Sequence, residues 1–279
     1  MLKLKKLPLV SVIITTRNSA TTLSALLESI RKQTYPKIEI ILVDNKSTDR
    51  TTEIAREYTR KVYNKGPERS AQRNFGVKQA SGKYILILDS DMRLTKLVVE
   101  QCVNKLEKSP LIGALVIPEK SFGEGFWTKV KVYEREFYLG ESDIEAARFF
   151  RTNIFRKSGG YDLSITGPED WDLPLRMKKD GVKISRIKSF ILHNEGRFSI
   201  TRSAKKKFYY ASHALSYLQR HPEMISSQGN LLFRPVFFRK WRKLISHPVL
   251  AFGLLLMRSV EMTGALLGLI ASILYSKKH

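Results

Sequence analysis

Short β-branched runs alternate with amphipathic helical segments through the first two thirds of the chain, and this alternation restricts the fold more than any other feature. Extended segments are expected at 9–16, 38–43, 61–64, 84–88 and 111–118, and helices at 19–30, 48–58, 69–80 and 95–108. Strands separated by helices of about 10–15 residues indicate βαβ units and a mostly parallel sheet flanked by helices. The sequence therefore predicts an α/β fold for this part of the chain.

Acidic side chains follow two of these predicted strands. Asp44 ends the second strand, and Asp89 and Asp91 end the fourth, with Ser90 between them. In an open α/β sheet, ligands bind beyond the carboxyl ends of the strands. Because side chains alternate along an extended chain, we expect Asp89 and Asp91 to point to one side and Ser90 to the other. A polar turn at the end of a buried strand is the plainer interpretation of the same residues.

The paired acids also raise a question of charge. Two neighbouring carboxylates are costly unless a positive charge joins them, and a divalent cation that holds a diphosphate would supply it. Carboxylate oxygens suit Mg²⁺ or Mn²⁺. Neither GxGxxG nor GxxxxGK[ST] follows the first predicted strand. A nucleotide bound at this edge would therefore depend on a metal ion rather than on a glycine-rich loop.

The chain is strongly basic, because 49 Lys and Arg residues against 26 Asp and Glu residues give a net charge of +23. From Lys183 to His279 there are 17 basic and 3 acidic residues, in the third that also holds the most apolar segment. Such an excess attracts nucleic acid or an anionic membrane surface. The single cysteine, Cys102, excludes a disulfide framework, and we expect it in a helix core and the protein in a reducing compartment.

The C-terminal third is typical of a membrane-associated segment. Basic and aromatic residues interleave at 205–210 and 231–244, and residues 248–275 are mostly apolar. Arg258 and Glu261 interrupt this apolar run at a helical spacing of three and could pair. Basic flanks on both sides favour an in-plane or re-entrant pair of helices over a single span or a soluble helical lid.

The order of the motifs points to a family. The residues that carry the resemblance are 10–18, 40–51, 73–92, the GGYD at 159–162 and 167–177. Together they resemble a family 2 glycosyltransferase with the GT-A fold, and the resemblance covers roughly residues 8 to 195. It implies a catalytic domain at 1–228, followed at 229–279 by basic amphipathic and hydrophobic membrane-associated helices.

The resemblance also assigns roles to individual positions. It implies that the donor, a UDP- or GDP-sugar, is bound by Thr16, Arg17, Asp44, Asn45, Arg73, Asp89 and Ser90. It implies that the metal ion is bound by Asp89, Asp91 and His193. It also implies that Asp170 is the catalytic base. Each position also has a structural interpretation. Asp44 is also typical of a turn, and Arg73 of a solvated helix face. His193 is also typical of a half-buried position at a strand end. The acids at 169–170 are also typical of a helix N-terminus.

These observations predict an inverting, metal-dependent glycosyltransferase at the cytoplasmic face of the cell membrane. A hydroxyl acceptor needs a base such as Asp170, which favours a lipid-linked glycan. A polyprenyl phosphate is already anionic, so a dolichyl-phosphate type sugar synthase remains an alternative. A basic nucleic-acid-binding protein would explain the charge but neither the acids at strand ends nor the apolar segment, and we expect no nucleic-acid partner. A sugar-binding protein without turnover is the remaining alternative.

Overall fold

A computed structural model describes residues 7–141, 144–213 and 234–276, and the chain divides into two compact units. The first unit comprises Met1–Glu119, Ala146–Leu163 and Asp172–Leu192, and the second comprises Lys120–Glu145, Ser164–Trp171 and His193–His279. The boundary expected between residues 228 and 229 lies outside the described residues, as does the start of the basic and aromatic run at 231–244.

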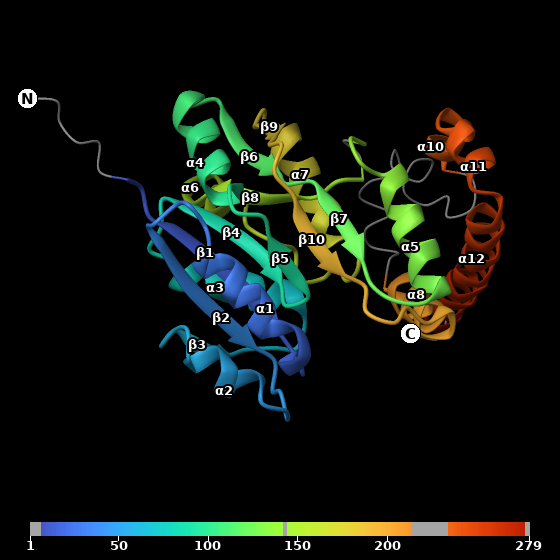
Figure 1. The fold of residues 1–279 in the computed structure, drawn as a ribbon. Coiled ribbons are helices and arrows are strands. Elements are labelled where there is room, and N and C mark those ends of the chain that lie inside the picture. Colours follow the sequence, from blue (N-terminus) through green and yellow to red (C-terminus); the bar gives the residue numbers. More distant parts are fainter. Residues whose placement is uncertain (1–6, 142–143, 214–233, 277–279) are drawn as a thin grey trace, which may run out of the picture. The chain divides into compact units, whose positions relative to one another are not determined.

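A seven-stranded sheet forms the centre of the first unit (Figure 1). Its order is β3 (Val62–Asn64), β2 (Ile38–Asp44), β1 (Val10–Thr16), β4 (Tyr84–Asp89), β8 (Ala147–Arg151), β6 (Ile112–Val116) and β9 (Lys183–Arg186). All neighbours are parallel except for β8, which is antiparallel to both β4 and β6. The mostly parallel α/β sheet that the sequence predicts is therefore confirmed.

Helices cover both faces of this sheet. On one face lie α1 (Ala20–Arg31), α2 (Thr51–Arg56) and α4 (Val98–Lys108), and on the other α3 (Arg69–Gln79), α6 (Thr152–Lys157) and α7 (Glu169–Lys179) from Asp172 onwards. The apolar face of the amphipathic helix α1 is buried, and so is Cys102 on α4. Complete burial of one leucine contributes about 1.5–3 kcal/mol, so these stripes fix the helices to the sheet.

The start of α1 is held by hydrogen bonds from the loop that follows β2. Ser19 is the residue before the helix, but its side chain makes no capping bond to α1. Instead, Asp49 Oδ2 accepts the backbone N–H of Ala20 at 3.1 Å, and the Ser19 N–H donates to Thr51 Oγ1 at 2.7 Å. The following loop therefore satisfies the helix N-terminus. The Ser19 hydroxyl is left to accept from Ser90 Oγ at 2.8 Å.

A small three-stranded sheet has the order β5 (Met92–Leu94), β10 (Ile191–Asn194) and β7 (Glu119–Phe122). Along β7 and β10 the chain passes from the first unit into the second. Ser90 and Asp91 form the turn between β4 and β5. The alternation expected for Asp89, Ser90 and Asp91 requires an extended chain, which ends at Asp89 with β4.

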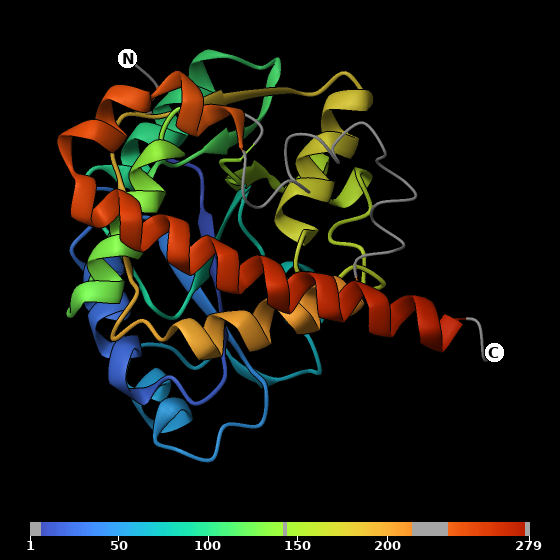
Figure 2. The same cartoon turned by 90° about the vertical axis from the view of Figure 1, so that its right-hand side faces the viewer.

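Helices dominate the described part of the second unit. They are α5 (Phe126–Phe137), α8 (Ile200–Ser212), α10 (Pro235–Arg239), α11 (Trp241–Ser246) and α12 (Pro248–Ser276). Figure 2 shows α8 and α12 side by side, and the apolar core includes Val130, Phe137, Phe237 and Met257.

The apolar C-terminal segment forms one continuous helix, α12, so the expected pair of helices is wrong for this segment. Arg258 and Glu261 do not interrupt α12, because both side chains are buried and lie 3.6 Å apart, which confirms their predicted pairing. Within the described ranges, α12 is also the one helix whose length and apolar composition would allow it to cross a membrane, a test that a buried core helix can also pass.

Candidate active site

The carboxyl edge of the first unit's sheet brings together the acids that the sequence places at strand ends. The strand register pairs Thr16 with Asp44 on one side of β1 and Thr15 with Asp89 on the other. Both carboxylates therefore flank the end of β1, although they are 45 positions apart in the sequence. This is the edge at which open α/β sheets bind ligands.

Asp44 is buried at this edge and is held by three hydrogen bonds. Its Oδ1 accepts from Thr16 Oγ1 at 2.7 Å and from Ser47 Oγ at 2.6 Å. Its Oδ2 accepts the Ser47 N–H at 2.7 Å. The turn after β2 thus fixes the carboxylate, and the structural interpretation of Asp44 as a turn residue holds alongside any role in binding.

Two arginines surround Asp89. The fully buried Arg73 on α3 donates from Nη2 to Asp89 Oδ1 at 2.9 Å, and Arg148 Nη1 on β8 lies 3.7 Å from Oδ2. Thr15 Oγ1 also donates to Oδ1, at 3.3 Å. Burial alone would raise the pKa of Asp89, but the guanidinium groups of Arg73 and Arg148 hold it well below its ordinary value. Asp89 therefore stays ionised in the folded protein.

Arg148 is a member of this cluster that the sequence reasoning missed. It is almost fully buried, and its Nε donates to Glu119, so its guanidinium group bridges Glu119 and Asp89. The signal in the sequence is weak, because one charged residue in a short strand usually indicates the solvent face. Its proximity to Asp89 arises from the antiparallel insertion of β8 beside β4.

Gln72 is a second residue that sequence reasoning missed. Its side-chain amide donates to the carbonyl of Thr16 at 3.0 Å and to that of Val43 at 2.7 Å. One buried side chain thus ties the ends of β1 and β2 together, next to Asp44. Asn45, also a predicted donor contact, uses its Nδ2 to donate to the Pro67 carbonyl at 2.5 Å, whereas Arg17 is exposed.

The donor set at this edge suits a metal ion that is shared with a substrate. Across residues 7–141, 144–213 and 234–276, no group of three or more His, Cys, Asp or Glu side chains could by itself hold a metal ion. Mg²⁺ is usually bound through one or two carboxylates, with water and substrate phosphates completing the shell. Asp91, next to the arginine-bound Asp89, fits that pattern, so the residues suit a divalent cation held jointly with phosphate oxygens.

The glycines of the GGYD motif form a tight turn. Gly159 and Gly160 have φ values of 77° and 71°, and a Cβ on Gly160 would lie 2.6 Å from Asn74 Oδ1. Asn74 exchanges two hydrogen bonds with the backbone of Tyr161, and the Arg73 guanidinium lies 5.0 Å from the Tyr161 ring centroid. The motif therefore supports Arg73, which in turn contacts Asp89.

Asp170 and His193 belong to the second unit. Asp170 is half-buried near the start of α7, where the adjacent Glu169 accepts the Gly167 N–H at 2.6 Å. Glu169 thereby has the local role expected for an acid at a helix N-terminus. His193 lies on β10, two residues before Glu195, whose pKa Arg135 lowers against the opposing effect of burial. The catalytic role of Asp170 and the metal role of His193 remain predictions.

The family model of "Glycosyl transferase family 2" matches residues 11–161, more than half of the chain. Among curated relatives, the "PGL/p-HBAD biosynthesis glycosyltransferase" of Mycobacterium bovis is 27% identical over 253 residues, which is 86% of this chain and 93% of the relative. The Staphylococcus aureus poly(ribitol-phosphate) beta-N-acetylglucosaminyltransferase TarS is 27% identical over 222 residues, 72% of this chain and 35% of TarS.

Solved structures share the fold at low sequence identity. The mannosyltransferase PcManGT from Pyrobaculum calidifontis, in complex with GDP-Man and Mn²⁺, has a TM-score of 0.63 at 19% identity and covers 96% of this chain and 86% of its own. S. aureus TarS 1–349 has a TM-score of 0.54 at 18% identity and covers 97% and 92%. The chain therefore belongs to glycosyl transferase family 2 and is a glycosyltransferase with the GT-A fold.

Proposed function

We propose that the protein transfers a sugar from a nucleoside-diphosphate sugar to a hydroxyl acceptor on a membrane lipid-linked glycan, with inversion and with the help of a divalent cation. The observation that carries the proposal is the placement of Asp44 and Asp89 on either side of the end of β1. The solved relatives support the donor class, since they are complexes with UDP, UDP-GlcNAc and GDP-Man with Mn²⁺.

Donor binding is assigned to the edge of the sheet. Asp44, held by Thr16 and Ser47, presents a fixed carboxylate that can accept from a ribose hydroxyl or a base. Arg73 and Arg148 hold Asp89 on the other side of β1. Arg17 is exposed just after β1, so its guanidinium group can approach phosphate oxygens. Asn45 and Ser90 complete the contacts proposed for the nucleotide.

Asp91 is proposed to bind the divalent cation that neutralises the diphosphate, with Asp89 and His193 as further proposed ligands of that cation. A bound Mg²⁺ or Mn²⁺ would neutralise the diphosphate and so stabilise its departure from the sugar. The Mn²⁺ in the PcManGT complex supports this proposal. The protein's own contribution is to hold Asp89 ionised and in place, which its buried arginine contacts accomplish.

Asp170 is proposed as the general base. A hydroxyl is a poor nucleophile, and a carboxylate that takes its proton during attack on the anomeric carbon typically contributes 10²–10⁴-fold in rate. One displacement at that carbon inverts its configuration. A polyprenyl phosphate acceptor needs no base, so the requirement for Asp170 separates the proposed reaction from that alternative.

The test is product analysis with membranes, a panel of UDP- and GDP-sugars and Mn²⁺, followed by detection of added hexose in the lipid fraction. Asp170→Asn should lower transfer at least about 100-fold while donor binding persists. Asp180→Asn, which changes an exposed acid just beyond the C-terminal end of α7, serves as the control. Undiminished transfer by Asp170→Asn would contradict the assigned base, and no transfer from any donor would contradict the proposed reaction.

A further inference from the structure

Helix α12 buries its charged residues and exposes its large apolar residues. Its charged residues, Arg258 and Glu261, are 3% and 0% exposed, whereas Val249, Phe252 and Leu274 are 67%, 64% and 60% exposed. Globular proteins in water usually keep charges at the surface and bury large apolar residues. The outer face of α12 is therefore built to meet something apolar.

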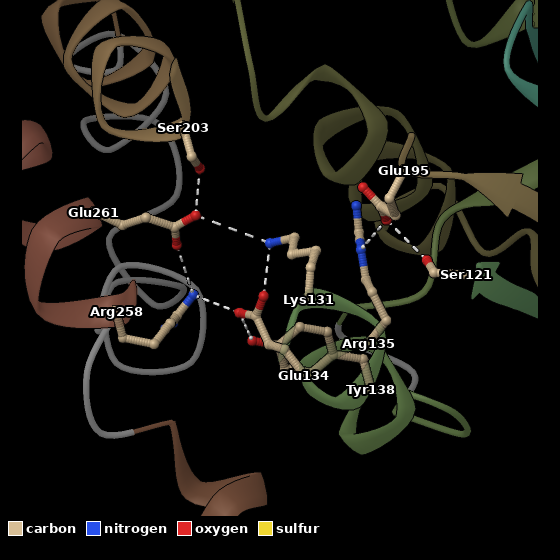
Figure 3. A network of polar contacts seen from close by, with 9 residues as sticks. All are labelled: Ser121, Lys131, Glu134, Arg135, Tyr138, Glu195, Ser203, Arg258 and Glu261. Atoms are coloured by element: carbon tan, nitrogen blue, oxygen red, sulfur yellow. Dashed lines mark hydrogen bonds and ion pairs between the residues drawn. The ribbon is translucent and has the colours of Figure 1, made fainter. Parts of the chain in front are cut away.

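The buried charges hold α12 to its neighbours within the second unit (Figure 3). Arg258 Nη1 donates to Glu134 Oε1 at 2.8 Å, and Lys131 Nζ lies 2.6 Å from Glu134 Oε2 and 3.9 Å from Glu261 Oε1. Ser203 on α8 also donates to Glu261. Because these partners come from α5 and α8, the polar face of α12 is committed to the protein interior, and its rotation about the helix axis is fixed.

Exposed apolar side chains lie on α10, α11 and the outward face of α12. On α12 most of them recur every three or four residues, as one helical face requires. The residues on the three helices are Phe238, Trp241, Ile245, Val249, Phe252, Leu256, Val260, Leu267, Ile270 and Leu274, each at least 40% exposed. An exposed apolar surface of this extent on a soluble protein marks an interaction site. We call it the apolar stripe.

Cations accompany the apolar stripe. Residues 200–212 and 234–276 contain ten arginines and lysines and one acid, the buried Glu261. Lys205, Lys206 and Arg242 are exposed, and the Arg242 guanidinium lies 5.8 Å from the Trp241 ring centroid. Apolar side chains with aromatic residues and cations beside them match the boundary of an anionic bilayer, where rings lie at headgroup level and cations meet lipid phosphates.

The packing of α8 decides whether α12 crosses the bilayer or lies in its plane. A Cβ on Gly264 would lie 2.5 Å from the Ala204 carbonyl oxygen, and Gly268 meets Phe208 in the same way, so the GxxxG pair brings α8 against the middle of α12. If α12 crossed, this contact would carry Lys205 and Lys206 into the hydrocarbon. Each such charge costs about 2.5–3.5 kcal/mol at the bilayer centre.

We propose that the apolar stripe docks in the plane of an anionic lipid leaflet, with α12 lying along the surface and not crossing it. This inference rests on the membrane location included in the proposed function but not on its chemistry. Lipid phosphates balance the cations of α8 and α11, and the outward apolar residues enter the acyl boundary. The docked face would bring the enzyme to lipid-borne acceptors without a spanning segment.

Co-sedimentation of the purified full chain with vesicles tests the partner. We expect binding to vesicles of phosphatidylglycerol and phosphatidylcholine, with much weaker binding to phosphatidylcholine alone. Phe252→Glu with Leu256→Glu should reduce binding at least about tenfold, and Lys205→Gln with Lys206→Gln about 30-fold. The controls are Leu111→Glu, at a residue 72% exposed in the first unit, and Lys78→Gln with Lys96→Gln. Equal loss in variants and controls, or binding that ignores lipid charge, overturns the proposal.

Spin labels placed on cysteines at Val249, Val260 and Ile270 test the orientation in the same vesicles. The native Cys102 is buried and does not compete for the label. An in-plane helix gives three similar, shallow depths, whereas a spanning helix gives a deep value for Val260, and that result overturns the proposal. The proposal is also overturned if a variant of the apolar stripe loses self-association of the chain but still binds vesicles. In that case a second copy of the chain, and not the membrane, covers the apolar stripe.

Donor hydrolysis in detergent separates this inference from the proposed function. If the unaltered protein hydrolyses the donor but does not bind vesicles, the result counts against the docking face alone. Retained vesicle binding without hydrolysis counts against the chemistry alone.

Discussion

Asp89 shows how single residues set the character of the candidate site. From the sequence, two acids at a strand end need a positive charge, such as a metal ion, to offset their repulsion. In the structure, Arg73 and Arg148 already offset the charge of Asp89. The cation proposed for this edge therefore does not have to stabilise the folded protein, and its role can be confined to the substrate.

Arg148 offers a direct test of this arrangement. Arg148→Met removes a buried cationic partner that Asp89 and Glu119 share, and should lower the free energy of unfolding by about 3–5 kcal/mol. Adding Asp89→Asn should recover part of that loss, because the uncompensated charge is removed. Urea unfolding of the two single variants and the double variant measures the coupling. Arg31→Met, at a side chain 76% exposed, is the control, and strict additivity would contradict the contact.

At the scale of elements, local patterns and long-range contacts had different predictability. The strands and helices before residue 118 follow from periodicity, because each signal lies within a few neighbouring residues. The continuity of α12 could not be predicted in this way, since Arg258 interrupts the apolar pattern and its partner Glu134 is 124 positions away. The same reason explains why the contacts of Gln72 and Arg148 were missed.

Gly264→Ala tests whether α12 is packed on α8. In an isolated helix, alanine in place of glycine stabilises by up to about 1 kcal/mol. Here the added Cβ would meet the Ala204 carbonyl, so we expect destabilisation of about 1–3 kcal/mol in thermal or urea unfolding. Thr263→Ala, on the exposed side of α12, should change stability by less than about 0.5 kcal/mol. A more stable Gly264→Ala variant would show that the two helices do not pack.

The charge network of α5 and α12 predicts sensitivity to acid. Burial alone would raise the pKa of Glu134, but Lys131 and Arg258 hold it well below its ordinary value of 4.5. Because the pKa is lower in the folded state, Glu134 contributes stability above pH 4.5 that is lost as the pH falls below that value. Unfolding in urea between pH 7 and pH 3 measures this loss. Glu134→Gln should be less stable at pH 7 and less dependent on pH, and an unchanged pH dependence would contradict the network.

At the scale of the whole molecule, the motifs predicted the family, and the alternation of strands and helices predicted the fold. Sequence reasoning placed Asp44 and Asp89 at one edge because strand ends are local features and parallel strands share an edge. It could not determine which charges balance Asp89, nor that the charges of α12 turn inward, since both depend on packing between distant segments. Membership of glycosyl transferase family 2 favours the transferase over the nucleic-acid alternative. The proposed docking on an anionic leaflet would account for the basic charge.

Calorimetric titration of the protein with UDP and GDP, with and without Mn²⁺, tests the central claim most directly. The account predicts that one nucleoside diphosphate binds, that binding requires the metal ion, and that Asp91→Asn weakens it at least about tenfold. Asp180→Asn should bind as the unaltered protein does. Failure of both nucleotides to bind, or an affinity that depends neither on Mn²⁺ nor on Asp91, would contradict the account.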